Sequence, residues 1–133
     1  MTELIFMSRE HIDRMNELLG ESAEVASACA RLDRDYSLTY ELLDGPDGTV
    51  YWTMRFDREQ GASFSLEPPA HADATFVSEW AATIRYSRAA RNGEQVTEPI
   101  LEVRGDPSVT EIVAEAFSAA HKAATIPTVF PEV

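Results

Sequence analysis

The sequence of 133 residues is poor in cysteine and has no long apolar run. Its single cysteine, Cys29, has no partner within the chain, which excludes an internal disulfide and the paired-cysteine patterns of zinc sites. No stretch approaches the roughly 20 apolar residues of a membrane span. The first residues also lack the basic segment that begins a signal peptide. We therefore expect a soluble, cytoplasmic protein.

Positive charge is scarce as well. The chain has 11 lysine and arginine residues against 23 aspartate and glutamate residues, so its formal net charge is −12. Repulsion from phosphate groups argues against a nucleic-acid partner and against an anionic membrane surface. The apolar share of 44% and the charged share of 26% are typical of a globular protein, and the length fits a single domain, residues 1–133.

Groupings that carry chemistry are also missing. The three histidines, His11, His71 and His121, are far apart in the sequence, which argues against a metal site. There is no G-x-S-x-G nucleophile motif and no glycine-rich phosphate loop. Cys29 lies among alanines, as a small buried residue does. Glu79 is the nearest candidate for a general acid, but acidic residues are common in the first turn of a helix. We expect no catalytic residue, metal or cofactor.

What the sequence does have is clear hydrophobic periodicity. Helical spacing in residues 1–32 predicts either one kinked helix or two consecutive helices, with Ser8 as the first cap. Residues 36–104 then alternate with a period of two in several segments, which predicts a sheet with an inserted helix, for which Ser78 is the candidate cap. Residues 107–123 show strong helical spacing, and residues 125–133 form a proline-broken tail expected to pack on the body.

The segment Gly105-Asp106-Pro107 separates the last strand from the last helix. Glycine can adopt the backbone shape needed to leave a strand. Aspartate is a favoured N-cap and proline fits the first helical position, so the segment is predicted to be a structural joint. Ser108 and Glu111 offer a second capping box in a shifted register. The simplest arrangement of all these elements is an α+β fold, a single mostly antiparallel five-stranded sheet covered by helices.

The predicted inner faces of these elements are rich in large apolar residues. They are Trp52, Met54, Phe56, Phe64, Leu66, Trp80, Ile84, Ile112, Val113 and Phe117. One interpretation is that they fill a close-packed core. The other is that they line a lipid-sized cavity between the sheet and the helices. Periodicity is compatible with both.

Four segments in order resemble the sterol carrier protein type-two domain. They read YELLDGPDGTVYWTMRF, ADATFVSEWAATI, RNGEQVTEPI and LEVRGDPSVTEIVAEAF, and they span roughly residues 36 to 120. The acidic, proline-bearing GEQVTEP and the long N-terminal helical region depart from the family pattern. The resemblance implies a sheet flanked by helices, with an apolar tunnel that binds sterols, fatty acyl chains or other lipids.

Three functions are compatible with these features. The first is a non-enzymatic carrier for an apolar ligand such as a fatty acyl chain, a sterol-like lipid or an acyl-CoA. The second is a cone-shaped α+β enzyme of the cyclase or isomerase type, which a buried carboxylate or histidine in an apolar pocket would favour. The third is a homodimeric interaction module. Its contacts would come from Tyr51, Thr53 and Arg55 on the sheet, or from Val129 and Phe130 in the tail.

Overall fold

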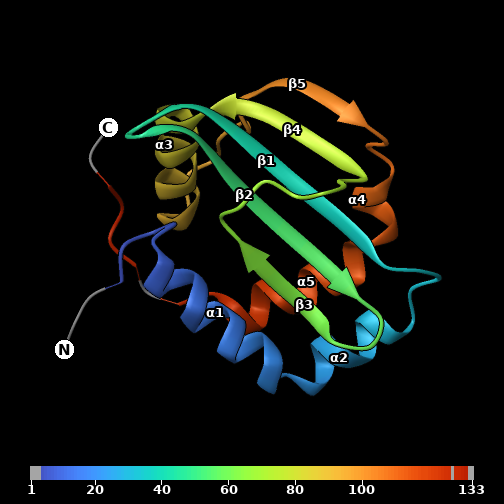
Figure 1. Cartoon of the computed structure of the whole chain (residues 1–133). Coiled ribbons are helices and arrows are strands. Elements are labelled where there is room, and N and C mark those ends of the chain that lie inside the picture. The colour runs from blue at the N-terminus through green and yellow to red at the C-terminus, as the bar shows by residue number, and fades with distance from the viewer. Residues whose placement is uncertain (1–3, 127, 132–133) are drawn as a thin grey trace.

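The computed structural model describes residues 4–126 and 128–131 (Figure 1). The elements follow one another as helix, sheet, helix, strand and helix. In chain order they are α1 (Arg9–Glu21), α2 (Ala23–Ala30), β1 (Tyr36–Gly45), β2 (Gly48–Asp57), β3 (Gly61–Ser65), β4 (Ala74–Glu79), α3 (Trp80–Arg91), β5 (Ile100–Gly105), α4 (Val109–Ile112) and α5 (Ala114–Ala124). None of the helices in the described ranges is both long and apolar enough to cross a bilayer.

The strands form one five-stranded sheet in the order β3-β2-β1-β4-β5. Strands β1 and β4 pair in parallel, and the other three pairs are antiparallel. The predicted fold class, an α+β domain with a mostly antiparallel sheet, is confirmed. The single parallel pair arises because the connection from β3 to β4 crosses β2 and β1 before the chain re-enters the sheet (Figure 1).

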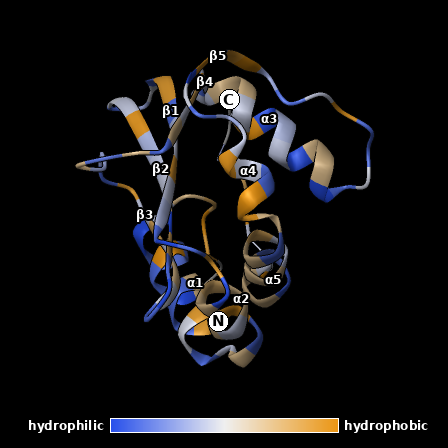
Figure 2. Cartoon of the chain, turned by 90° about the vertical axis from the view of Figure 1, so that its right-hand side faces the viewer, coloured by the Kyte–Doolittle hydropathy of each residue, from blue (hydrophilic) through white to orange (hydrophobic). Residues whose placement is uncertain are grey.

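The helices gather on one face of the sheet. Figure 2 views the sheet edge-on, with α3, α4 and α5 together on one side of it. The main core lies between this face and helices α1, α2 and α5, and it includes Met15, Val25, Leu38 and Phe56. Leu42 and Ile84 are also completely buried, but they lie outside that continuous cluster, where α3 covers β1 and β4. The apolar packing therefore has two parts.

The N-terminal region forms two helices, one of the two predicted arrangements. The Ser8 side chain accepts a hydrogen bond from the His11 N–H at 3.2 Å, which confirms it as the cap of α1. Gly20 does not interrupt this helix, which continues to Glu21. The break comes at Ser22, whose side chain accepts a hydrogen bond from the Val25 N–H and begins α2.

The prediction that Ser78 begins the inserted helix is wrong. Ser78 is buried in β4, and its hydroxyl donates a hydrogen bond to the Pro99 carbonyl oxygen at 2.6 Å. This hydroxyl is therefore committed to the segment that precedes β5, and α3 begins at Trp80 without a side-chain cap.

The predicted continuous C-terminal helix of residues 107–123 is interrupted. Val113, with φ −92° and ψ 6°, separates α4 from α5. The capping box proposed at Ser108 is absent, because no side chain caps α4 there. Val113 itself is completely buried, whereas Ile112 is 46% exposed and Phe117 is 40% exposed.

The opposite face of the sheet is covered in part. Thr39 and Thr53 are buried there, with their hydroxyl oxygens 2.8 Å apart. The Thr53 hydroxyl also donates to the Glu67 carbonyl oxygen at 3.1 Å, so the β3–β4 connection lies over it. Thr53 is therefore not exposed and cannot form the dimer contact that the interaction-module hypothesis assigned to it.

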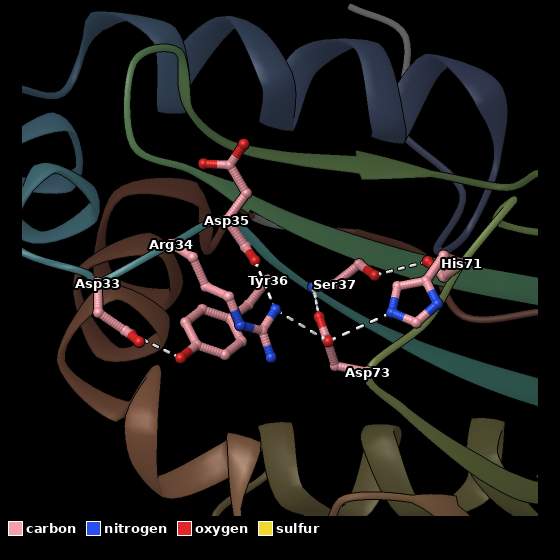
Figure 3. Close-up of polar contacts among 7 residues, drawn as sticks. All are labelled: Asp33, Arg34, Asp35, Tyr36, Ser37, His71 and Asp73. Atoms are coloured by element: carbon pink, nitrogen blue, oxygen red, sulfur yellow. Dashed lines mark hydrogen bonds and ion pairs between the residues drawn. The ribbon is translucent and has the colours of Figure 1, made fainter.

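The joint after β5 is held by Asp73, which begins the turn into β4 (Figure 3). The Asp73 carboxylate accepts hydrogen bonds from the Ser37 N–H at 2.8 Å and from Arg34 at 3.0 Å. Its backbone carbonyl accepts a third, from the Asp106 N–H, at 2.9 Å. Burial would raise the pKa of the Asp73 carboxyl, but the hydrogen bonds from Ser37 and Arg34 and the charge of Arg34 outweigh it and hold the pKa below its usual range.

Gly105 is required at this joint. Its φ is 78°, and a Cβ at this position would lie 2.4 Å from the Asp73 carbonyl oxygen. Asp106 accepts hydrogen bonds from the Ser108 N–H and hydroxyl. The segments Ala72-Asp73 and Gly105-Asp106 thus meet at one joint between β1, β4 and β5. This arrangement supports the prediction that Gly105-Asp106-Pro107 has a structural role.

Candidate functional site: a cavity between the sheet and the helices

A cavity of about 650 Å³ lies between the sheet and the helices. Strands β1, β2 and β3 form its floor, and α1, α3, α5 and residues 98–100 form its walls. It is open to solvent, and several residues of its lining are exposed, among them Arg91, Phe117 and His121. A volume of this size is in the range of small-molecule sites, roughly 300–1,000 Å³.

Four of the ten predicted cavity residues line this space. They are Trp52, Met54, Phe64 and Phe117. The alternation of β2 and β3 places the first three on the inner sheet face, where Met54 and Phe64 are direct partners across the strands. Phe117 comes from α5 on the opposite wall.

The other six lie elsewhere. Three are completely buried and fill the two parts of the core: Phe56, Ile84 and Val113. Leu66 packs against the main core, and Trp80 lies beside Gly45 at the β1–β2 hairpin. Ile112 is exposed on α4. Periodicity identifies side chains that face inward, but it does not distinguish those that meet other side chains from those that meet open space.

Aromatic rings from distant segments pack together at the wall of the cavity. The ring of Phe6 lies 5.7 Å from Trp52 and 4.9 Å from Phe130, measured between centroids, and Trp52 lies 5.2 Å from Phe64. Backbone hydrogen bonds join the segment before α1 to the tail, including one from the Phe6 N–H to the Val129 carbonyl oxygen at 2.9 Å. The described part of the tail therefore packs on the body, while Pro127, Glu132 and Val133 lie outside the described residues.

His11 is a cavity residue that the sequence interpretation missed. It is only 2% exposed, and its Nδ1 accepts a hydrogen bond from the Met7 N–H at 3.0 Å. Met7 adopts a left-handed backbone with φ 66°, which is uncommon for a residue other than glycine. Burial, and then the charge of Arg91, lower the pKa of His11 to about 4. The ring is neutral at pH 7 and, because Nδ1 is an acceptor, carries its proton on Nε2.

The sequence did contain a signal for His11. It precedes Met15 by four residues, and Met15 belongs to the buried stripe of α1, so the two side chains share a helix face. The wide sequence spacing of the three histidines argued against a metal site, but spacing along the chain does not indicate which histidine is buried. His121 comes from α5, more than a hundred residues away in sequence, yet it lines the same cavity.

A second polar group in the cavity surrounds Tyr40 on β1. Burial, and then the negative charge of Glu98, raise the pKa of Tyr40, so its hydroxyl remains protonated. Its ring stacks on Phe76 with a centroid separation of 5.3 Å. Tyr86 and Thr83 from α3 line the adjacent wall. The surface of the cavity is thus mainly apolar, with polar residues from β1, α1, α3 and α5 among its lining.

A smaller hollow of about 410 Å³ lies on the other face of the sheet, against the β3–β4 connection. Its lining mixes apolar residues with Arg34, Ser37, His71 and Asp73, which are joined by hydrogen bonds (Figure 3). These hydrogen bonds belong to the structural joint between β1, β4 and β5 described above. Within the described ranges, no group of three or more histidine, cysteine or acidic residues is arranged to hold a metal ion.

Solved structures share the fold of this chain. The crystal structure of sterol carrier protein 2 is 17% identical, with a TM-score of 0.52 over 90% of this chain and 96% of that chain. The ubiquinone synthesis protein UbiJ-SCP2 is 23% identical, with a TM-score of 0.46 over 81% and 86%. Protein TT1886 of Thermus thermophilus, described as a possible sterol carrier protein, is 16% identical, with a TM-score of 0.47 over 92% of each chain.

No family model and no curated protein sequence matches the chain. At 17% identity, the likeness to sterol carrier protein 2 is a likeness of fold. The chain therefore has a sterol-carrier-protein-2-like fold, which confirms the resemblance that the sequence motifs indicated.

Proposed function

We propose that this protein is a carrier or binding protein for an apolar ligand, such as a fatty acyl chain, a sterol-like lipid or an acyl-CoA, and that it does not transform that ligand. The cavity carries the proposal. Aromatic and methionine side chains line it, it is open to solvent, and most of its surface is apolar, although residues such as Tyr40, Arg91 and Glu98 add polar groups. The fold shared with sterol carrier protein 2 supports the same function.

The driving force would be removal of apolar ligand surface from water, at about 25 cal/mol per Å². Phe117 is 40% exposed in the free protein and would also lose contact with water when the cavity is filled. The net charge of −12 would oppose approach to an anionic bilayer. We therefore expect the protein to take up single ligand molecules from solution or from uncharged membrane surfaces.

The two tryptophans allow a direct test. Trp52 lines the cavity and Trp80 does not. In a Trp80→Phe variant, Trp52 is the only tryptophan, and a brominated fatty acid should quench its fluorescence with a saturable curve of one ligand per chain. The matched control is Trp52→Phe, in which Trp80 remains and should be quenched little. Native mass spectrometry should show the same one-to-one complex. Absence of both the complex and the quenching with a fatty acid, a sterol and an acyl-CoA alike would contradict the proposal.

A second candidate function, an enzyme of the isomerase or cyclase type, is favoured by one observation: a buried histidine does lie in the apolar cavity. His11 can donate a hydrogen bond from Nε2, but its lowered pKa makes it a weak base at pH 7. Among the described residues, no carboxylate is hydrogen-bonded to its ring to form a catalytic pair. These properties suit ligand orientation better than proton abstraction.

Product analysis separates the two functions. After incubation with a fatty acyl-CoA, a carrier returns the ligand unchanged. Conversion of the ligand that disappears in a His11→Gln variant would instead favour the enzyme. Self-association through the tail is a separate hypothesis, for which Val129 is 44% exposed. Light scattering of the protein with and without residues 126–133 would measure whether the chain forms a homodimer.

A further inference from the structure

The two edge strands of the sheet, β3 and β5, differ in how their outer sides are covered. Helix α1 packs on β3, and its Asn16 side chain bonds the edge backbone much as a neighbouring strand would. The Asn16 amide donates to the Phe64 carbonyl oxygen at 3.0 Å and accepts from the Phe64 N–H at 2.8 Å. At the other edge, five of the six residues of β5 are exposed. An exposed edge strand is a template for pairing with another strand.

One face of the β5 edge is apolar. Val103 is 44% exposed and Leu101 is 63% exposed, and Ile112 of α4, the helix that follows β5, is 46% exposed. Val103 pairs with Phe76, which pairs with the cavity residue Tyr40, so Val103 lies on the helix side of the sheet. Figure 2 shows apolar colouring on both β5 and α4. Large apolar side chains therefore meet water at this edge.

The opposite face of β5 carries charges of both signs. Arg104 forms ion pairs with Glu41 of β1 at 3.3 Å and with Glu102 at 3.2 Å. Glu102 and Arg104 flank Val103, so an antiparallel copy of β5 with Val103 opposite Val103 would place each Glu102 opposite an Arg104. Centring the pair on Glu102 or on Arg104 would instead oppose two like charges. Opposite charges across a strand pair stabilise it and like charges destabilise it, so the charges select one register.

We propose that β5 is the interaction surface for a second copy of this chain, which pairs with it edge to edge, antiparallel, with Val103 on the two-fold axis. A symmetric dimer requires a surface that is complementary to itself, and the charges of β5 meet this requirement. The two five-stranded sheets would form one continuous sheet. The register between β4 and β5 shifts beside Leu101, so the regular part of the new strand pair is centred on residues 102–105.

This dimer is expected to be weak. A strand of six residues buries less surface than a standard interface of roughly 1,600 Å², and the net charge of −12 on each copy opposes association. The dimer fraction should therefore rise with protein concentration in sedimentation velocity experiments. The surface is separate from the cavity and from the tail, so the inference is independent of the proposed carrier function.

Cysteine cross-linking tests the register directly, because the single native cysteine, Cys29, is buried. Opposite Val103 residues on the axis would have Cα atoms about 4.5–5.5 Å apart, which suits a disulfide. Val103→Cys should therefore form a disulfide-linked dimer under mild oxidation. Leu101→Cys is the matched control, because its side chain is more exposed but its two copies would lie about 13 Å apart. Equal cross-linking of both variants, or none in Val103→Cys, would overturn the proposal.

Charge reversal gives a second readout without oxidation. Glu102→Arg would place arginines opposite each other, and Arg104→Glu would place glutamates opposite each other, so each variant alone should lose the dimer. A mixture of the two restores opposite charges and should give a heterodimer in native mass spectrometry. A monomeric mixture, or single variants that dimerise like the unmodified protein, would overturn the proposal. If Arg104→Glu fails to fold because it loses its pair with Glu41, the two cysteine variants decide the question.

Discussion

The joint between β5 and α4 gives the sharpest test of the structure, through the substitution Gly105→Ala. A Cβ there would lie 2.4 Å from the Asp73 carbonyl oxygen and 3.2 Å from the Ala74 Cα. Both are backbone atoms, which cannot rotate away. The left-handed φ of 78° adds about 1–2 kcal/mol for alanine, and displacement of Asp73 would weaken its hydrogen bond from the Asp106 N–H, worth about 1 kcal/mol. We expect a total loss of about 2–4 kcal/mol from a domain stability of about 5–15 kcal/mol.

Gly93→Ala is the matched control. Gly93 has nearly the same backbone, with φ 82°, but an added Cβ would meet nothing within 4 Å. It should cost the backbone strain alone, about 1–2 kcal/mol. The assay is urea unfolding of both variants, with the free energy of unfolding compared at an unchanged m-value. If the two variants lose the same free energy, the close approach of Gly105 to Asp73 is not a feature of the folded protein.

Four further predictions concern stability. Gly20→Ala should stabilise the protein by about 0.5–1 kcal/mol in the same assay, because Gly20 is inside α1 with open space at its Cβ position. Asp73→Ala should cost about 1–3 kcal/mol, because the Ser37 N–H loses its acceptor; an equal loss in Asp73→Asn would point to another cause. Phe56→Ala should cost about 3–5 kcal/mol, and Phe64→Ala clearly less, because the Phe64 ring already borders open space; equal losses would argue against the cavity. His11 has a pKa of about 4 in the folded protein, against 6.5 for an unperturbed histidine. The unfolded state therefore binds the proton more readily. We expect the free energy of unfolding to be highest above pH 6.5 and to fall as the pH drops toward 4. Arg91 lines the same cavity and opposes a charge on His11, whereas Glu98, also in the lining, has the opposite sign. His11→Gln should remove this part of the pH dependence of the thermal midpoint.

Much of the local structure could be predicted because short-range patterns carry it. Alternation placed Trp52, Met54 and Phe64 on one sheet face, and the pairing of β1, β2 and β3 confirms this. Capping chemistry placed the start of α1 at Ser8 and favoured a joint at Gly105. Each of these features depends on a few neighbouring residues, so the pattern and the structure have the same physical cause.

The errors arose where a distant segment competes with a local preference. Ser78 has the side chain of a helix cap, but the Pro99 carbonyl, 21 residues away, accepts its hydrogen bond. The apolar spacing of residues 109–120 predicted one helix, and the break at Val113 divides it while that side chain remains in the core. His11 and Arg91 line the candidate site but were not predicted, because the prediction of cavity residues considered only the apolar side chains of the inner faces.

The amino-acid sequence alone specifies an acidic, single-cysteine α+β domain, because charge, composition and hydrophobic period are properties of the chain before it folds. Which inward side chains meet one another, and which meet open space, depends on how the elements pack in three dimensions. Phe56 and Phe64 have the same residue type and the same alternation, yet one is completely buried and the other lines the cavity. The difference comes from α1, α2, α3 and α5, because their positions over the sheet determine where packing is complete and where a volume for a ligand remains.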